Sequence, residues 1–195
     1  MLGHQSPDYY QEQFDSQGYT TKEGFSFIYT HTPFSFSVSS LILDMGILFP
    51  EQPATASSQL IISTGSAGGY SISAYEDYSL QTPDNSASIP DTSCDLSQCA
   101  RSQAQLWTGN TTYGFGFNIK GNDTAPDFET PYFYRPFANQ AEGQPPQIIM
   151  AGQINVPNPP SYIKKATINL KTNVSTDQKI GKYANEITLL ALPNY

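Results

Sequence analysis

Two cysteines are the residues whose chemistry the sequence constrains most tightly. Cys94 and Cys99 are the only cysteines, and they lie in the polar stretch IPDTSCDLSQCARS. Structural zinc sites need four ligands, and the distant His4 and His31 do not complete such a set. The spacing also differs from that of a redox C-x-x-C motif. We therefore favour a local disulfide that staples a loop in an oxidising compartment; two free thiols in a loop are the alternative.

The motifs that carry nucleophilic or nucleotide chemistry are missing. The run Thr64–Gly68 resembles a G-x-S-x-G elbow only loosely, and a turn between strands explains it better because no acid–histidine pair accompanies it. No phosphate-binding loop, H-E-x-x-H motif or EF-hand loop occurs. Gly114–Gly116 is not a dinucleotide fingerprint, since no helical pattern follows it. The sequence predicts no enzyme activity and no cofactor.

Acidic and amide side chains gather in two polar loops. Calcium binds several oxygen ligands, so two such loops could form a calcium site. Solvated turn residues are the favoured interpretation, and we predict no metal site. The residues are Asp84, Asp91 and Asp95 in the first loop, and Asn122, Asp123, Asp127 and Glu129 in the second.

Aromatic side chains are the candidates for recognition. Trp107, Tyr113, Tyr132 and Tyr134 could stack on sugars or on a partner protein. Most aromatic residues should nevertheless lie in the core. Trp107 is the expected anchor if it is exposed, because tryptophan is favoured at binding hot spots; core packing is the other interpretation, and we favour it slightly.

The elements that would position these residues are strands. Hydrophobic residues alternate with polar ones in several runs, which places them on opposite faces of a pleated strand. Turn residues separate the runs, and no convincing helix is found. About nine short strands with frequent turns predict an all-β fold, an Ig-like antiparallel β-sandwich, with an up-and-down barrel as the alternative. The clearest runs are 34–38, 70–74, 115–119, 166–172 and 183–191.

The predicted organisation is one domain with a leader. Residues 1–24 are polar and lack periodicity, which indicates a flexible leader, and residues 25–195 form a single β-sandwich domain. Weak patterning in 82–110 indicates a long insertion loop, which the cysteines would staple. We expect Tyr70 and Tyr183 to mark strand entries and to place their rings in the core.

The charge excludes one class of partner. The net charge is −8, which argues against nucleic-acid binding. Acidic residues concentrate in the first half of the chain, a polarity that could orient subunits head to tail. No run is long and apolar enough to span a membrane. The segment 1–7 has no basic start or apolar stretch, so we expect no export segment within this chain.

The order of several segments resembles a class of bacterial secreted proteins. The stretch 33–80 is similar to the opening of secreted β-sandwich proteins; it is followed by DTSCDLSQC, Trp107, TTYGFGFNIKG and YFYRPFAN. The close, 167–195, resembles the ending shared by these proteins, WxL-type cell-wall domains, and spore-coat U and pilin-like domains. The resemblance spans about 19–195 and is greatest to surface proteins of candidate-phyla bacteria such as Saccharibacteria. The matched positions in the first stretch are Asp44, Gly46, Leu48, Pro50, Thr64, Gly69 and Tyr70.

This resemblance implies an exported β-sandwich with a structural or adhesive role. Wall-binding domains carry Trp-x-Leu motifs, whereas Thr108 and Gly109 follow Trp107 here, so wall binding of that type is not expected. We expect a non-catalytic extracellular or cell-surface protein whose partner is a cell-surface protein, a glycan or another copy of itself. A carbohydrate- or cell-wall-binding module is the alternative function.

Overall fold

The computed structural model describes residues 13–14, 20–21, 34–65, 68–153 and 162–194. Met1–Pro33 and Phe34–Tyr195 form two separate units. In the first, β1 (Gln13–Phe14) pairs antiparallel with β2 (Thr20–Thr21). The rest of the predicted leader, and the predicted start of the sandwich at residues 25–33, lie outside the described residues.

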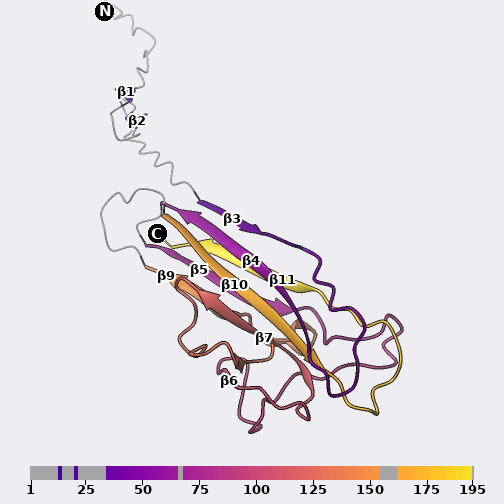
Figure 1. Ribbon diagram of the computed structural model, residues 1–195. Helices are drawn as coiled ribbons and strands as arrows, with labels where there is room; N and C mark the ends of the chain where they lie inside the picture. The colour runs from indigo at the N-terminus through magenta and orange to yellow at the C-terminus, as the bar shows by residue number, and fades with distance from the viewer. Residues whose placement is uncertain (1–12, 15–19, 22–33, 66–67, 154–161, 195) are drawn as a thin grey trace, which may run out of the picture. The chain divides into compact units, whose positions relative to one another are not determined.

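Residues 34–194 form two antiparallel sheets that pack together (Figure 1). This arrangement confirms the all-β prediction and the packing of antiparallel sheets. The four-stranded sheet has the order β3 (Phe34–Val38), β4 (Ala54–Thr64), β10 (Tyr162–Asn173) and β7 (Gly114–Gly121). The three-stranded sheet has the order β11 (Ile187–Pro193), β5 (Tyr70–Glu76) and β9 (Gln147–Gly152). A separate two-stranded ladder pairs β6 (Gln105–Leu106) with β8 (Phe133–Tyr134). The 3₁₀-helix Gln140–Glu142 is the one helix of the described residues.

The strand order departs from that of an immunoglobulin constant domain. That domain joins its first, second, fifth and fourth strands in one sheet and its third, sixth and seventh in the other. Here β10, the sixth strand of the two sheets, lies between β4 and β7, whereas β9, the fifth, lies at the edge of the three-stranded sheet, in which β5 is central. The sandwich has four strands facing three without the immunoglobulin order.

Alternation along the strands builds the core. In β10, Ile168 and Leu170 face inward, where Ile168 lies opposite Ile119 of β7 and Leu170 lies opposite Phe117. Tyr70 at the start of β5 is fully buried, as predicted from its place at a strand entry. Alternate residues of β10 point to the other face, so a polar residue beside a core residue is expected there.

The last strand is shorter than the sequence pattern predicted. It begins at Ile187 rather than at Tyr183, so that part of the prediction is wrong. The alternating pattern in the sequence extends upstream of the strand to Tyr183, because the Tyr183 side chain packs half-buried against the core. Tyr183 itself lies in the segment that connects β10 to the other sheet. Ala184 makes an isolated bridge with Gln81 there, but no continuous ladder forms. No helix among the described residues is long and apolar enough to cross a membrane.

Candidate functional site

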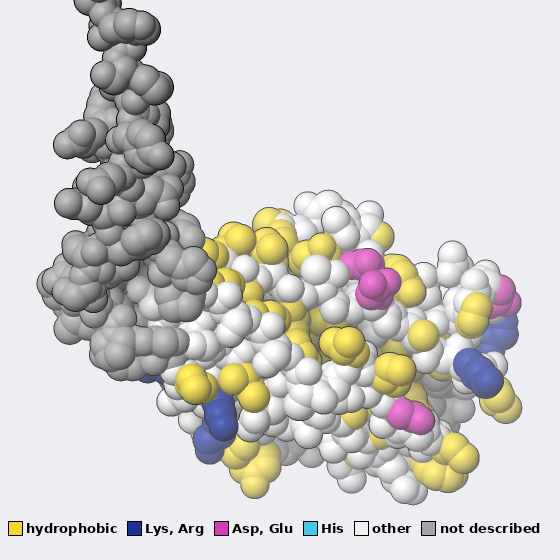
Figure 2. Space-filling view, turned by 90° about the horizontal axis from the view of Figure 1, so that it is seen from above, with side chains coloured by type: hydrophobic (Ala, Val, Ile, Leu, Met, Phe, Trp, Pro, Cys, Tyr) yellow, Lys and Arg dark blue, Asp and Glu magenta, His cyan; other side chains and the backbone are white. Residues whose placement is uncertain are grey.

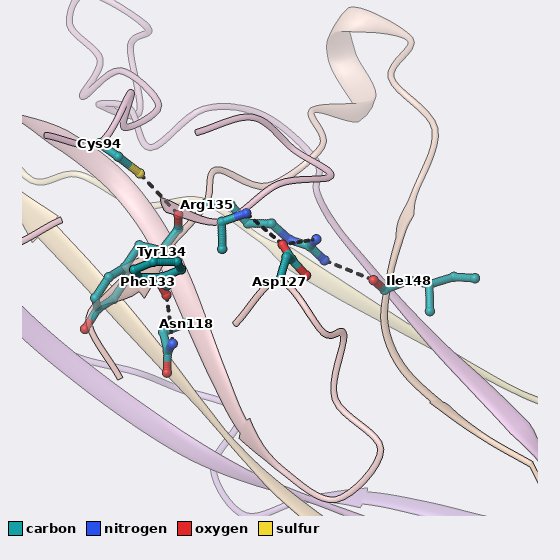
Figure 3. A network of polar contacts seen from close by, with 8 residues as sticks. Cys94, Asn118, Asp127, Phe133, Tyr134, Arg135 and Ile148 are labelled. Carbon is teal, nitrogen blue, oxygen red and sulfur yellow. Dashed lines mark hydrogen bonds and ion pairs between the residues drawn. The ribbon is translucent and has the colours of Figure 1, made fainter. Parts of the chain in front are cut away.

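The two cysteines form the predicted disulfide. Cys94 and Cys99 are bonded, with their Cα atoms 5.6 Å apart. The Cys94 sulfur also lies 3.1 Å from the carbonyl oxygen of Tyr134 at the end of β8 (Figure 3). Since a disulfide sulfur carries no hydrogen to donate, this is a close polar contact that fixes the loop against β8.

Trp107 lies in a small second core rather than at the surface. Its side chain is 0% exposed, and its ring meets that of Tyr134 edge to face at a centroid distance of 5.5 Å. The indole Nε1 donates to the carbonyl of Thr112. The condition for Trp107 as an exposed anchor is therefore not met, and Tyr134 is buried with it beside the disulfide.

A buried lysine holds this second core on the sheet. Lys171 of β10 points to the face opposite Leu170, and its Nζ donates to the carbonyl of Trp107 at 2.7 Å. The same ammonium lies 4.4 Å from the centroid of the indole ring, a cation–π geometry. Burial lowers the pKa of Lys171, an effect that the charge of Asp95 opposes. The loop thus covers the outer face of the four-stranded sheet.

The other two aromatic candidates are more accessible. Tyr132 is 60% exposed. Tyr113 is half-buried, and its hydroxyl lies 3.3 Å from the carboxylate of Glu51, to which it donates. The structure therefore brings Trp107 and Tyr134 together in the interior and leaves Tyr132 free to contact a partner.

The acidic loop residues serve as acceptors within the protein. Asp95 accepts hydrogen bonds from Thr108, Gly109 and Thr112, which shape the turn after Trp107. Asp123 accepts from the Tyr70 hydroxyl at 3.0 Å. Within the described part of the chain, no group of three or more His, Cys, Asp or Glu side chains is arranged to hold a metal ion.

One long edge of the sandwich is closed by the segment that follows β7. Residues of this segment extend β9 through backbone bonds, since Ala151 donates to Asp123 and Ala125 donates to Ile149. The same segment then pairs with β7, where Phe117 and Arg135 exchange two backbone hydrogen bonds. The gap between β7 and β9 is thereby covered.

A buried ion pair locks this closed edge. Arg135 donates to Asp127 at 2.9 Å and to the carbonyl of Ile148 in β9 at 2.9 Å (Figure 3). Its guanidinium also stacks 4.7 Å from the ring centroid of Phe128. Gly116 in β7 permits the approach, because a Cβ there would lie 2.8 Å from the carbonyl oxygen of Arg135.

At the opposite long edge, no further strand of the described residues adds to the two sheets, and we call this edge open. Because β7 and β9 share the closed edge, β3 and β11 share the other one. Among the described residues, β3 pairs only with β4, and β11 pairs only with β5. Most inward side chains of the inner strands are fully buried, whereas those of β3 and β11 are only half-buried. The half-buried inward residues are Phe34, Phe36 and Val38 of β3 and Ile187, Leu189 and Ala191 of β11.

The open edge, which we call the open seam, is adjoined by an apolar groove at one end of the sandwich. The segment between β3 and β4 and the segment between β10 and β11 come together there (Figure 1) and line a groove of about 1070 Å³. Leu41, Ile42, Ile47 and Ile180 line it and are each more than 80% exposed. Figure 2 shows hydrophobic side chains reaching the surface across one face of this unit with few charged groups among them.

A buried acid pair is a feature that sequence reasoning missed. Glu76 at the end of β5 is 0% exposed, and the nearby charge of Asp91 acts on it. One Glu76 oxygen accepts from Asn185 at 2.9 Å, and the other has no hydrogen-bond donor. Asp91 was singled out as a loop acid, but nothing in the sequence pattern pairs it with Glu76.

The acid pair should make stability depend on pH. Burial, followed by the nearby Asp91 charge, raises the pKa of Glu76, and a hydrogen bond from Asn185 opposes this shift. Burial also raises the pKa of Asp91, whereas hydrogen bonding with Glu76 and the charge of Arg101 oppose it. The charge of Glu142 adds to both upward shifts. The folded protein therefore binds more protons than the unfolded chain, so stability is greatest below about pH 4 for this pair and falls as pH rises through the raised pKa. We expect Glu76→Gln to flatten this fall between about pH 5 and about pH 8 in urea unfolding.

A matched control is Glu129→Gln, since Glu129 is exposed in a neighbouring loop. That substitution should leave the pH profile unchanged. An equally steep profile in Glu76→Gln would show that the raised pKa of Glu76 does not cause the fall in stability.

The placement of the remaining polar groups had no signal in the sequence. Lys171 and Arg135 belong to patterns that suit exposed strand positions, and only contacts across the fold bury them.

Comparison of the chain with protein-family models, curated proteins and solved structures found no match in any of the three.

Proposed function

We propose that this chain is a non-catalytic extracellular module, structural or adhesive, that takes up an extended segment of protein along its open seam. The observation that carries the proposal is the contrast between the two long edges. The β7–β9 edge is paired, packed and held by Arg135, whereas β3 and β11 present half-buried core residues beside strand edges to which no other described strand adds. We also propose that the sandwich is Ig-like in its layers, because four strands face three, although the order of its strands differs from that of an immunoglobulin constant domain.

Strand edges next to exposed core residues favour strand addition. The outer N–H and C=O groups of an edge strand are a template for another chain, and side chains of that chain fill the pockets between the sheets. β11 is apolar on both faces, since Leu189 and Ala191 point inward while Leu190 and Leu192 are exposed. It carries no charged residue of the kind that protects natural sheet edges.

The chemistry of the open seam and groove suits a protein partner better than a glycan. Sugar-binding sites present exposed aromatic faces beside polar groups. Here the most exposed side chains that line the groove are aliphatic, although Tyr183 and several polar residues also line it, and Trp107 and Tyr134 are buried elsewhere. A carbohydrate- or wall-binding module stays the alternative function, with Tyr132 as its exposed aromatic residue.

The Cys94–Cys99 disulfide supports a place outside the cytosol, because such bonds persist in oxidising compartments. The absence of an enzyme activity remains part of the proposal.

Hydrogen exchange of dilute full-length protein tests the open seam as a strand acceptor. The probe is an excess of a short synthetic peptide that alternates valine and threonine. We expect the peptide to slow exchange in β11 and β3 and to leave β7 and β9 unchanged, because an added strand bonds to the open edge. Ala191→Lys, which places a charge in the open seam, should remove this protection; Ile163→Lys, at an exposed residue of β10, should keep it.

No protection of β11 or β3 by the peptide would overturn the proposal. Binding of purified cell-wall polysaccharide that Tyr132→Ala abolishes would instead establish the alternative function.

A further inference from the structure

On the basis of the proposed function, we infer that the partner of the open seam is an uncharged extended strand that runs antiparallel to β11 and ends, on its carboxyl side, in an apolar anchor that enters the groove. This occupant adds a direction, a composition and a second contact site to the proposed function. Both contact sites, the open seam and the groove, consist of described residues.

Alternate backbone groups of β11 point away from its sheet. Asp77 donates to the carbonyl of Glu186, and the two residues lie opposite each other in the β5–β11 register. Asn194 donates to the carbonyl of Gly69 at the other end. Since hydrogen-bonded pairs recur at every second residue of an antiparallel ladder, the even-numbered residues of β11 bond to β5. The outward groups belong to the odd-numbered residues, which are Ile187, Leu189, Ala191 and Pro193.

Pro193 marks the far end of this edge. It has no N–H to donate, and at an outward position it removes no bond to β5, which is where a strand tolerates proline. An added strand gains only the Pro193 carbonyl there. The edge that an added strand can use therefore runs over the seven residues of β11, from Pro193 back to Ile187.

The side chains of β11 set the composition of the added strand. Opposite residues of an antiparallel pair place their side chains on the same face. Partner residues that bond to Leu189 and Ala191 therefore project between the sheets, where those two side chains pack half-buried against the core. The alternate partner residues lie beside Leu190 and Leu192, which are 44% and 49% exposed. Apolar or β-branched residues suit both faces.

Charge complementarity favours an uncharged strand in the open seam. Neither β3 nor β11 contains Asp, Glu, Lys or Arg, although the chain has a net charge of −8. A charged partner residue between the sheets would be buried without an opposite charge. The groove differs, because Lys179 and Lys182 line it together with one carboxylate, that of Asp44. An acidic partner residue therefore suits the groove and not the open seam.

The position of the groove determines the direction of the strand. The segments that line it follow β3 and precede β11, so β3 runs toward the groove and β11 runs away from it (Figure 1). A strand antiparallel to β11 therefore runs toward the groove, and its carboxyl end arrives there. Pairing antiparallel to β11 is favoured, because antiparallel ladders are the more stable and β11 offers seven residues against the five of β3.

The groove suits an apolar anchor because its lining is continuous with the core. Phe115 and Leu170 line it and are 2% and 4% exposed, whereas Leu41 and Ile180 line it and are 90% and 99% exposed. Its volume of about 1070 Å³ lies near the upper end of the range of about 300–1,000 Å³ for small-ligand pockets. Large apolar side chains of the partner would cover the exposed aliphatic residues, which is favourable in water.

Three synthetic peptides with capped ends test the anchor on the full-length protein. The plain peptide consists of seven alternating valines and threonines. The anchored peptide continues at its carboxyl end into Leu-Phe-Glu, and the reversed peptide carries the anchored sequence in the opposite order. In fluorescence anisotropy we expect the anchored peptide to bind at least about tenfold more tightly than either of the others.

A nitroxide on the anchored peptide tests the direction. Placed at the carboxyl end, it should broaden the amide NMR signals of residues 178–185, which adjoin and line the groove. Placed at the amino end, it should broaden those of residues 191–194, at the far end of β11.

Ile180→Ser removes an apolar side chain from the groove without disturbing the core, since Ile180 is 99% exposed. It should weaken binding of the anchored peptide about tenfold and leave the plain peptide unchanged. Ile163→Ser is the matched control, because Ile163 is 65% exposed on β10 and does not line the groove; it should change neither. Thermal unfolding establishes that both variants are folded.

Several outcomes overturn the inference and leave the proposed function standing. If the plain peptide protects β11 but the anchor adds no affinity, the groove is not part of the site. If the reversed peptide binds as tightly, or the carboxyl-terminal nitroxide broadens residues 191–194, the direction is wrong. If the anchor adds nothing and Ile180→Ser dissolves a dimer in sedimentation velocity, a second copy covers the groove; if it instead abolishes flotation with phosphatidylglycerol vesicles, a lipid surface does. If the plain peptide protects neither β11 nor β3, the proposed function fails as well.

Discussion

Replacing Asp127 with alanine should lower the free energy of unfolding by about 3 kcal/mol, because it leaves the Arg135 guanidinium buried without its counter-charge. Arg135 is 2% exposed, and its Nε already lacks an acceptor. The same substitution removes the acceptor of the Ala104 N–H at 2.7 Å. Urea unfolding followed by circular dichroism measures the change.

The double variant Asp127→Leu with Arg135→Met should recover most of this loss, since apolar residues of similar size often replace a buried ion pair without penalty. Glu129→Ala, at an exposed residue of the same segment, should change stability by less than about 0.5 kcal/mol. Hydrogen exchange in Asp127→Ala should rise first in β9 and the 122–135 segment. A loss below about 1 kcal/mol would show that Arg135 is solvated and that the closed edge does not depend on the pair.

Replacing Trp107 with alanine should cost about 3–5 kcal/mol, the range for deleting a large buried aromatic ring. The ring fills the second core between the disulfide and Tyr134, and its loss also takes the π face from the Lys171 ammonium. Trp107 is the only tryptophan, so its fluorescence reports this core without interference. The folded protein should emit at shorter wavelength than the unfolded chain.

Tyr132→Ala is the control for this prediction, because Tyr132 is exposed and its ring is not part of that core. Its unfolding free energy should stay within about 0.5 kcal/mol of the wild type. A similarly small change for Trp107→Ala would show that Trp107 is not packed in the second core, and it would again be a candidate recognition anchor.

The contrast between the two long edges connects these stability predictions to the proposed binding of an extended segment. The closed edge gains its burial from residues of its own module, and the Arg135–Asp127 pair keeps them in place. The open edge leaves comparable inward residues half-buried. We therefore expect variants of the closed edge to lower the stability of the fold, whereas variants of the open seam should change the binding of an added strand.

The local pattern of residues determined the strands and the covalent link. Alternation placed Phe36, Ile72 and Ile168 on inward faces correctly, because side chains of a strand alternate between two faces whatever the strand pairs with. Cys94 and Cys99 are close in sequence, so a local disulfide was accessible to reasoning from spacing alone.

The tertiary structure decided which strand lies beside which, and therefore everything about the edges. Whether β10 pairs with β4 and β7, or β9 with β5, depends on long-range packing that no local pattern encodes. The same is true of Lys171 over Trp107 and of Glu76 beside Asp91, which come from distant parts of the chain. Alternation reports that a strand has an apolar face, but only the assembled sheets show whether that face is covered, because burial depends on neighbours that the chain supplies elsewhere or, at the open seam, does not supply within the described module.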